Sequence, residues 1–252
     1  MKKKIVLIAL LLAATVALSA FAASYPVKTV FSGTVKRSLP VYSVAREDKK
    51  IAITFDCAWG TDYTDLIIDA VDNYGVRCTF FAVEFWVEKY PETVKKLSDH
   101  GIEIGTHSKT HPHMSKMSVS EIKSELESSK KAIEDITGKK VTLFRAPFGE
   151  YNDAVVDTAA ALGLKTIQWD VDSLDWKDLS AEEIAARIIK NVKSGSIILC
   201  HNQGLHTAEA LPLVFTALKE KGFEFVTVSE LLLDGETVID GQGVMRPAPK
   251  AQ

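Results

Sequence analysis

The regular alternation of two sequence patterns is the feature that most constrains the fold of this chain. Short apolar runs rich in β-branched and aromatic residues predict buried strands over residues 50–55, 76–82, 102–106, 141–145, 164–169, 196–200 and 223–228. Amphipathic stretches of helical period lie between them, over residues 62–74, 91–100, 119–137, 153–162, 181–192 and 207–221. About seven such repeats predict an α/β fold with a single domain, a distorted (β/α) barrel of parallel strands covered by helices.

The two ends of the chain predict segments outside this barrel. Residues 1–23 combine three lysines, an apolar run and the small-residue site Ala20-Phe21-Ala22, which indicates a signal peptide and a secreted or extracytoplasmic protein. An uncleaved signal that tethers the protein to a membrane is the alternative. We expect a lead-in segment over residues 24–48, the barrel over 49–233 and a loose, Gly- and Pro-containing tail over 234–252.

Composition narrows the classes of function. The formal net charge is -3 and no basic face is evident, which argues against nucleic acid as a partner. The three cysteines, Cys57, Cys78 and Cys200, are an odd number for an oxidising compartment. At least one thiol is therefore expected to be unpaired, bound to a metal or bridged to another chain.

Polar residues follow the predicted strands at their C-terminal ends. These residues are Asp56, the pair His107 and His111, Arg145, the segment 170–175, and His201. The C-terminal strand ends of a parallel barrel share one face, and catalytic residues gather there. The four-residue spacing of His107 and His111 also allows one turn to aim two imidazoles at a metal ion. The sequence therefore predicts a single site built from distant parts of the chain.

Five motifs in order resemble those of the polysaccharide deacetylases of the NodB-homology type, carbohydrate esterase family 4, over residues 49–233. They are Thr54-Phe55-Asp56-Cys57-Ala58, His107-Ser108-Lys109-Thr110-His111, Arg145-Ala146-Pro147-Phe148-Gly149, Asp172-Ser173-Leu174-Asp175-Trp176 and Ile197-Ile198-Leu199-Cys200-His201. The resemblance implies an exported hydrolase that cleaves the linear amide of N-acetyl groups on an amino-sugar polymer of the cell envelope, with peptidoglycan the first choice. Its expected partner is this N-acetylated glycan, and no protein partner is expected. The run Cys57-Ala58-Trp59-Gly60 further resembles the sporulation-associated branch of the family.

The resemblance also implies a role for each catalytic residue. Asp56 would be the base that takes a proton from water, held ionised by Arg145. His201 would protonate the departing sugar amine, oriented by Asp175. A backbone N–H near Phe148 would hold the oxyanion. The expected substrate-binding residues are Phe148 and Trp176.

Cys57 leaves the metal site open. Family members usually hold a divalent ion with two histidines and the second aspartate of the first motif, and Cys57 replaces that aspartate here. Three interpretations follow: zinc bound by Cys57, His107 and His111, a metal bound by the two histidines alone, or no functional metal. The rival function is therefore a catalytically weak glycan-binding protein with a deacetylase fold, and a third is a metal-free amidohydrolase.

Some of these residues also suit plainer roles. Asp56 and Asp172 stand where a residue often caps a following helix. His113 and His206 belong to no motif, and we expect surface roles for them, with metal ligation as the alternative.

Overall fold

The computed structural model describes residues 37–249 of the chain. The predicted signal peptide (1–23), the first part of the lead-in (24–36) and the end of the tail (250–252) lie outside the described residues. Within the described part, none of the helices combines the length and the apolar character needed to cross a membrane.

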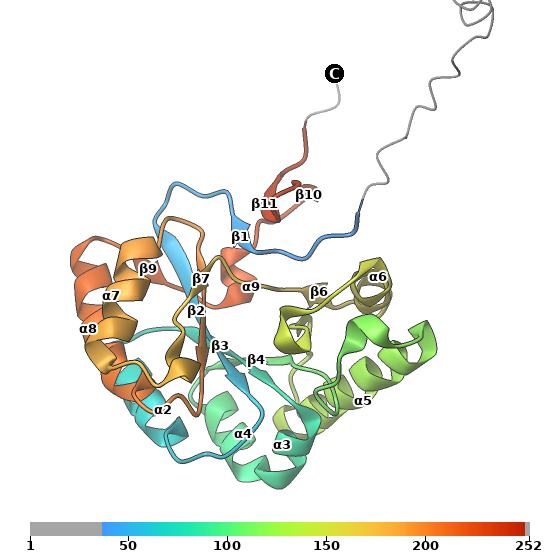
Figure 1. The fold of residues 1–252 in the computed structure, drawn as a ribbon, viewed down its shortest axis with the longest axis horizontal. Coiled ribbons are helices and arrows are strands. Elements are labelled where there is room, and N and C mark those ends of the chain that lie inside the picture. Colours follow the sequence, from blue (N-terminus) through green and yellow to red (C-terminus); the bar gives the residue numbers. More distant parts are fainter. Residues whose placement is uncertain (1–36, 250–252) are drawn as a thin grey trace, which may run out of the picture. The chain divides into compact units, whose positions relative to one another are not determined.

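A curved sheet of parallel strands forms the centre of the fold, in the order β6-β5-β4-β3-β2-β8-β7, and β9 pairs with β2 off this path (Figure 1). The strands are β2 (Lys50–Cys57), β3 (Cys78–Ala82), β4 (Glu103–Thr106), β5 (Leu143–Phe144), β6 (Lys165–Thr166), β7 (Val171–Asp172), β8 (Ile197–His201) and β9 (Glu224–Phe225). This half-barrel confirms the α/β barrel fold that the alternating pattern predicted.

Helices cover the outer side of this sheet (Figure 1). They are α2 (Thr64–Asn73), α3 (Glu84–Lys89), α4 (Pro91–Asp99), α5 (Val119–Thr137), α6 (Asp153–Ala161), α7 (Ala181–Asn191) and α8 (Thr207–Glu220). The short helix α9 (Val228–Leu231) packs instead in a second core cluster, with Ala52 of β2 and Ile197 of β8. Three short 3-10 turns lie between them: η1 (Met114–Lys116), η2 (Pro147–Gly149) and η3 (Asp175–Lys177). Both α5 and α7 begin with capping boxes, in which Ser118 pairs with Glu121 and Ser180 with Glu183, so these starts are written in the local sequence.

The predicted strand over residues 164–169 is shorter in the structure, and a separate strand, β7, follows it. β6 and β7 are consecutive in the chain but lie at opposite edges of the sheet, so residues 167–170 connect the two edges without a helix. Val41 adds backbone hydrogen bonds to this connection, because its N–H donates to the Thr166 carbonyl and its own carbonyl accepts from Gln168. The lead-in thus fills part of the gap that the open sheet leaves.

The C-terminal segment differs from the loose tail that was expected. β10 (Thr237–Ile239) and β11 (Val244–Pro247) form an antiparallel hairpin, and β11 pairs in parallel with β1 (Ser43–Val44). The side chain of Met245 is buried there. Short β-branched runs on either side of Asp240-Gly241-Gln242-Gly243 are a hairpin signal, which the glycines and prolines of this segment obscured.

The alternation of side chains along β2 decides what faces the site. Ile53, Phe55 and Cys57 pack in the layer between the sheet and its helices. Their neighbours point the other way, into the barrel, because successive strand residues face opposite sides. Asp56 therefore faces the interior and Cys57 the helices.

Candidate active site

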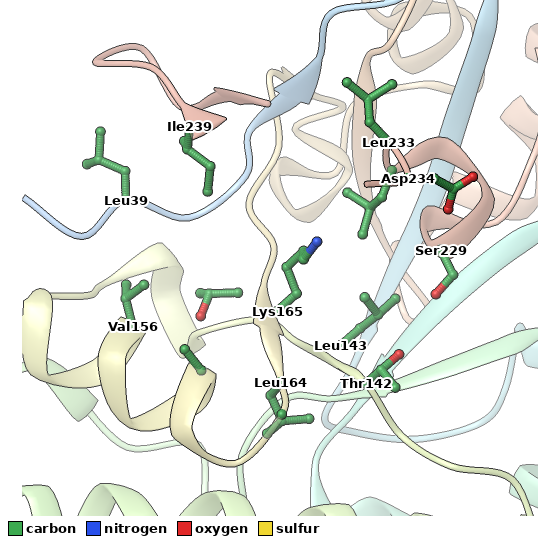
Figure 2. Close-up of a pocket in the computed structure, with 14 residues that line it drawn as sticks. Leu39, Thr142, Leu143, Val156, Leu164, Lys165, Ser229, Leu233, Asp234 and Ile239 are labelled. Atoms are coloured by element: carbon green, nitrogen blue, oxygen red, sulfur yellow. The ribbon is translucent and has the colours of Figure 1, made fainter. Parts of the chain in front are cut away.

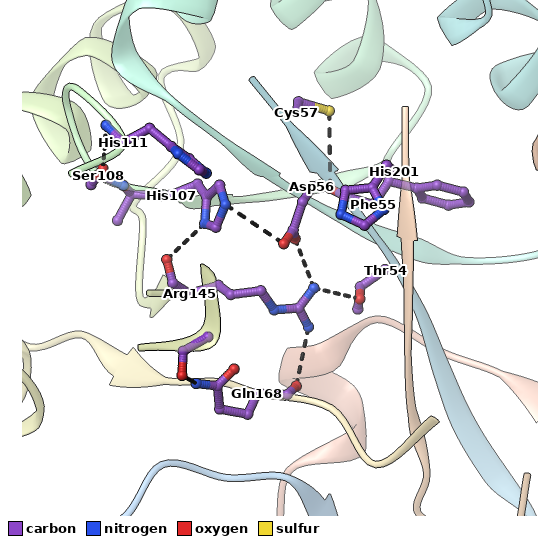
Figure 3. Close-up of polar contacts among 12 residues, drawn as sticks. Thr54, Phe55, Asp56, Cys57, His107, Ser108, His111, Arg145, Gln168 and His201 are labelled. Atoms are coloured by element: carbon purple, nitrogen blue, oxygen red, sulfur yellow. Dashed lines mark hydrogen bonds and ion pairs between the residues drawn. The ribbon is translucent and has the colours of Figure 1, made fainter. Parts of the chain in front are cut away.

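A cavity of about 540 Å³ opens at the C-terminal ends of the strands. The residues that line it come from the ends of β2, β7 and β8 and from the segments after β4, β5 and β7, and include Asp56, His107, His111, Phe148, Asp172, Trp176 and His201. The structure thus brings together residues that the sequence predicted on one face. Figure 3 shows Asp56, His107, Arg145 and His201 converging from separate elements.

Arg145 binds Asp56 inside the barrel. Nη1 of Arg145, a fully buried side chain, donates to Oδ1 of Asp56 and to the Thr54 hydroxyl, both at 2.8 Å. Nη2 donates to the Gln168 carbonyl at 3.1 Å, and the guanidinium stacks 4.2 Å from the Phe81 ring centroid. Burial alone would raise the pKa of Asp56, but the charge and hydrogen bond of Arg145 outweigh it and leave that pKa below its ordinary value. Asp56 is therefore a carboxylate at neutral pH.

The two histidines of the second motif are neutral imidazoles that face each other, with ring centroids 4.9 Å apart. Nδ1 of His107 lies 2.8 Å from the Arg145 carbonyl, which can only accept, so Nδ1 carries the proton and Nε2 a lone pair. That Nε2 lies 3.6 Å from Oδ2 of Asp56. Burial lowers the pKa of His107, and burial together with His107 lowers the pKa of His111 to about 4.

His201 and Asp175 form the second ion pair of the site. Nδ1 of His201 lies 2.7 Å from Oδ1 of Asp175, while Oδ2 accepts from the His201 backbone N–H and the Thr207 hydroxyl. Burial lowers the pKa of His201, but the hydrogen bond and charge of Asp175 raise it above its ordinary value. His201 also stands opposite Asp56 in the register of β2 and β8, so the two groups are neighbours across the strands.

Cys57 does not face the cavity, which corrects its assignment as a metal ligand. Its side chain is fully buried in the helix-side core, and its Sγ lies 3.9 Å from the Phe55 carbonyl (Figure 3). Burial, followed by the charge of Asp56, raises the pKa of the Cys57 thiol well above its ordinary value. Within residues 37–249, no three His, Cys, Asp or Glu side chains form a metal-binding group. The residues present therefore do not fit a three-ligand centre.

Exposed aromatic rings surround the mouth of the cavity. Phe148 and Trp176, the predicted substrate-binding residues, are 55% and 57% exposed, and Trp59 is 65% exposed. Phe148 has a left-handed backbone (φ 58°), which is uncommon for an aromatic residue, and its ring packs edge-on against His111 at 4.5 Å. His113 stacks on Phe148, also at 4.5 Å, and it is exposed, as its expected surface role requires.

The structure also gives the contacts of His206, Asp172 and Asp170. His206 precedes α8 and binds Glu209 beside it, a surface role. Asp172 lines the cavity, and its Oδ1 accepts from the N–H of Leu174, a local turn rather than a helix cap. Asp170 lies at the other end of the sheet, because it binds the Ile197 N–H and Ser196 at the start of β8.

Sequence reasoning missed the residues that hold the site loops in place. Glu125 of α5 accepts from the backbone N–H groups of Lys109 and Thr110 and from the Thr110 hydroxyl, at 2.8 to 2.9 Å. Asn202 donates to the Gly60 carbonyl at 3.0 Å. No motif includes these residues. A glutamate on the buried face of a predicted helix, as at Glu125, could nevertheless have indicated a structural hydrogen bond.

A second cavity, of about 560 Å³, lies near the starts of β5 and β6 (Figure 2). Leucines and other apolar side chains dominate it, and Lys165 and Asp234 are the charged residues that line it. Catalytic groups do not converge there, so the cavity around Asp56 is the candidate active site.

Comparison with known proteins agrees with this geometry. The profile of the polysaccharide deacetylase family matches residues 43–167. A peptidoglycan-N-acetylglucosamine deacetylase of Bacillus cereus is 38% identical over 196 residues, which are 76% of this chain and 92% of that protein. The peptidoglycan-N-acetylglucosamine deacetylase PgdA of Listeria monocytogenes is 35% identical over 77% of this chain.

The chain spans 60% of the length of YlxY of Bacillus subtilis and 41% of PgdA, both of which it matches. Among solved structures, BA3943 of Bacillus anthracis, described as a CE4 family pseudoenzyme, has a TM-score of 0.75 and 34% identity over 77% of this chain and 69% of that one. A mutant of BA3943 is described as having restored enzymatic activity. With these relatives and the five motifs on one face of the barrel, the chain belongs to the polysaccharide deacetylase family.

Proposed function

We propose that this protein is an exported hydrolase that removes N-acetyl groups from an amino-sugar polymer of the cell envelope, with peptidoglycan as the substrate. The observation that carries the proposal is the pairing of Asp56 with Arg145 and of His201 with Asp175 across neighbouring strands of one cavity. One pair keeps a base free of its proton and the other keeps an acid protonated. Amide hydrolysis requires both. The names of the Bacillus cereus and Listeria relatives support the same substrate class.

The reaction needs two proton transfers. Asp56 accepts a proton from a water molecule as the water oxygen attacks the acetyl carbonyl, and a backbone N–H near Phe148 stabilises the oxyanion. His201 then donates its proton to the sugar nitrogen as the carbon–nitrogen bond breaks. The products are acetate and a free amino sugar, and Phe148 and Trp176 supply apolar contacts to the substrate.

Zinc bound by His107 and His111 alone remains a prediction for this site. The lone pair on Nε2 of His107 supports a cation, and the turned-away sulfur of Cys57 argues against a complete ligand set. No step above depends on the ion.

Acetate release tests the proposal. Purified protein is incubated with N-acetylglucosamine oligomers and with peptidoglycan fragments, with and without added zinc. We expect acetate from the wild type and a loss of roughly 100-fold or more in Asp56→Asn and in His201→Ala, the range for removing a general base or acid. Equal acetate release by wild type and Asp56→Asn would contradict the proposal.

Glycan binding with little turnover is the second candidate, and the burial of Cys57 favours it. The similar fold of a Bacillus anthracis protein described as a pseudoenzyme supports it as well. This function predicts that the wild type binds glycan oligomers but releases no acetate. Turnover by the wild type would exclude it.

The location of the protein belongs to the same proposal. A substrate in the cell wall requires an extracytoplasmic enzyme, and we infer that residues 1–23 are the export signal, cleaved or retained as a tether. Mass spectrometry of the N-terminus of protein recovered from the producing cells tests this. The resemblance to the sporulation-associated branch stays a prediction.

A further inference from the structure

Trp59 is an exposed indole that the core does not require. Its side chain is 65% exposed, and it lines the cavity beside His111, with ring centroids 5.5 Å apart. Four aromatic side chains among the described residues are exposed, and Trp59, Phe148 and Trp176 line this one cavity, whereas Phe85 does not. Exposed apolar groups gathered at a cleft mark a ligand-binding surface.

The loop that carries Trp59 is held firmly. The Gly60 carbonyl accepts from Nε1 of Trp86 at 2.7 Å and from the Asn202 side chain at 3.0 Å. Gly60 has a left-handed backbone (φ 54°), and a Cβ at that position would clash with the side chain of Gln203. The backbone that carries the indole is therefore already ordered, so less conformational entropy of this loop is lost when a ligand binds.

The strand order separates Trp59 from Trp176. Trp59 leans toward the His111 loop, which follows β4, whereas Trp176 lies in η3, directly after Asp175 and on the side of β8 and β7. Asp56 on β2 lies between these two sides. A ligand that touches both indoles must therefore extend across the reaction centre.

An extended amino-sugar chain fits this arrangement. A pyranose ring has an apolar face of C–H groups that packs on the negative face of an indole, and its hydroxyls find polar groups at the rim such as Asp172 and Gln203. A cavity of about 540 Å³ also lies in the range that accepts ligands larger than one hexosamine.

We propose that Trp59 forms a second sugar-binding position, which stacks on a hexosamine next to the one bound beside Asp56 and Trp176. This inference rests on the proposed function, because it names the form of the substrate: a glycan chain of several sugars. Trp59 determines chain-length preference and takes no part in the proton transfers.

Binding by isothermal titration tests the inference, with N-acetylglucosamine and its pentamer as ligands. We expect the wild type to bind the pentamer more tightly than the monomer. In Trp59→Ala, the Kd for the pentamer should rise roughly tenfold, equivalent to about 1.4 kcal/mol, with the Kd for the monomer unchanged. Trp59→Phe should recover most of the loss, and Phe85→Ala, an exposed aromatic residue away from the cavity, is the matched control.

Acetate release separates this inference from the proposed function. If the wild type releases no acetate but Trp59→Ala selectively weakens pentamer binding, the proposed activity fails and the sugar position stands. If acetate is released and Trp59→Ala leaves pentamer binding and KM unchanged, the sugar position is wrong and the activity stands. Equal weakening of monomer and pentamer, or no pentamer binding by the wild type, also overturns it.

Discussion

Asp56 and His201 shift their pKa values in opposite directions, although both are buried beside the same cavity. Arg145 lowers the pKa of Asp56 against the effect of burial, and Asp175 raises that of His201 in the same way. A reaction that needs the Asp56 carboxylate and the His201 imidazolium gains rate as pH rises through the pKa of Asp56. It loses rate as pH rises through the pKa of His201. Arg145 and Asp175 therefore widen the pH range in which Asp56 is ionised and His201 is protonated.

Asp175→Asn should narrow that range from the alkaline side. Without the carboxylate, burial dominates and the pKa of His201 falls, so activity should be lost at lower pH than in the wild type. At neutral pH we expect a loss of roughly 100-fold in kcat/KM, the scale of general-acid catalysis. Rates of acetate release between pH 5 and 9 measure the shift, and an NMR titration of the His201 ring reports the same pKa without turnover.

Asp178→Asn is the matched control for this variant. Asp178 is exposed at the end of η3, and its left-handed backbone (φ 54°) suits asparagine. The role of Asp175 in raising the pKa of His201 is wrong if both variants show the same pH profile. It is also wrong if the His201 pKa in Asp175→Asn stays at its wild-type value.

Cys57→Ala should separate packing from ligation. Because Cys57 lies in the helix-side core, removing its sulfur should lower the free energy of unfolding by about 1 kcal/mol, the order of deleting one buried methylene-sized group. Zinc content and acetate release should equal those of the wild type. Urea denaturation and elemental analysis measure the two effects, with His111→Ala as the comparison. A folded Cys57→Ala protein that loses bound zinc would restore Cys57 as a ligand.

At the scale of elements, helix α5 holds the loop that carries His107 and His111. Ser108 and His111 both have left-handed backbones (φ 75° and 56°), each at a cost of roughly 1–2 kcal/mol. Such a loop persists only when its surroundings fix it. Glu125 does so through three hydrogen bonds to Lys109 and Thr110.

Glu125→Ala should therefore impair the site from outside it. Released from α5, the loop can relax and displace His111, and misplacement of about 1 Å is enough to reduce activity up to roughly 100-fold. We expect kcat to fall with little change in KM, and Glu125→Gln, which retains one acceptor oxygen, to recover part of the rate. Glu127→Ala on the exposed side of the same helix should have no effect. A crystal structure of Glu125→Ala with an unchanged loop would refute this role.

Elements with local signals were the most predictable. Residues 119–137 were expected to form a helix, and α5 has those bounds because its capping box and final Gly138 are written in adjacent residues. The break between β6 and β7 depends instead on hydrogen bonds with Val41 and Ile197. These residues are distant in the sequence, so no local pattern predicts the break. Once Asp56 is assigned to the interior, the alternation of side chains along a strand predicts that Cys57 faces the helices. The motif comparison alone did not use this alternation.

At the scale of the whole described molecule, the face of the site was predictable because parallel strands must all end on one side. The pairing of the C-terminal hairpin with β1 was not, since the two segments lie about 200 residues apart in the sequence. Contacts of this range leave no trace in local composition.

Met245→Ala tests whether this hairpin belongs to the cooperative fold. Met245 is 1% exposed, and its truncation should lower the free energy of unfolding by about 2–4 kcal/mol, with glycan binding intact at low temperature. Val119→Ala, at an exposed position on α5, should leave stability nearly unchanged. An unfolding midpoint for Met245→Ala equal to that of the wild type would mean that the hairpin is independent of the barrel.

The pairing of β1 with β11 sets an order of events for folding. Ser43 pairs with Val244 in the register. During synthesis from the N-terminus, this pair can therefore form only after almost the whole chain has left the ribosome. Contacts between such distant residues slow folding, because a long loop must close first. Until then β1 presents an unpaired backbone edge, which is a template for aggregation. A chain that stops before Val244 would keep that edge open permanently.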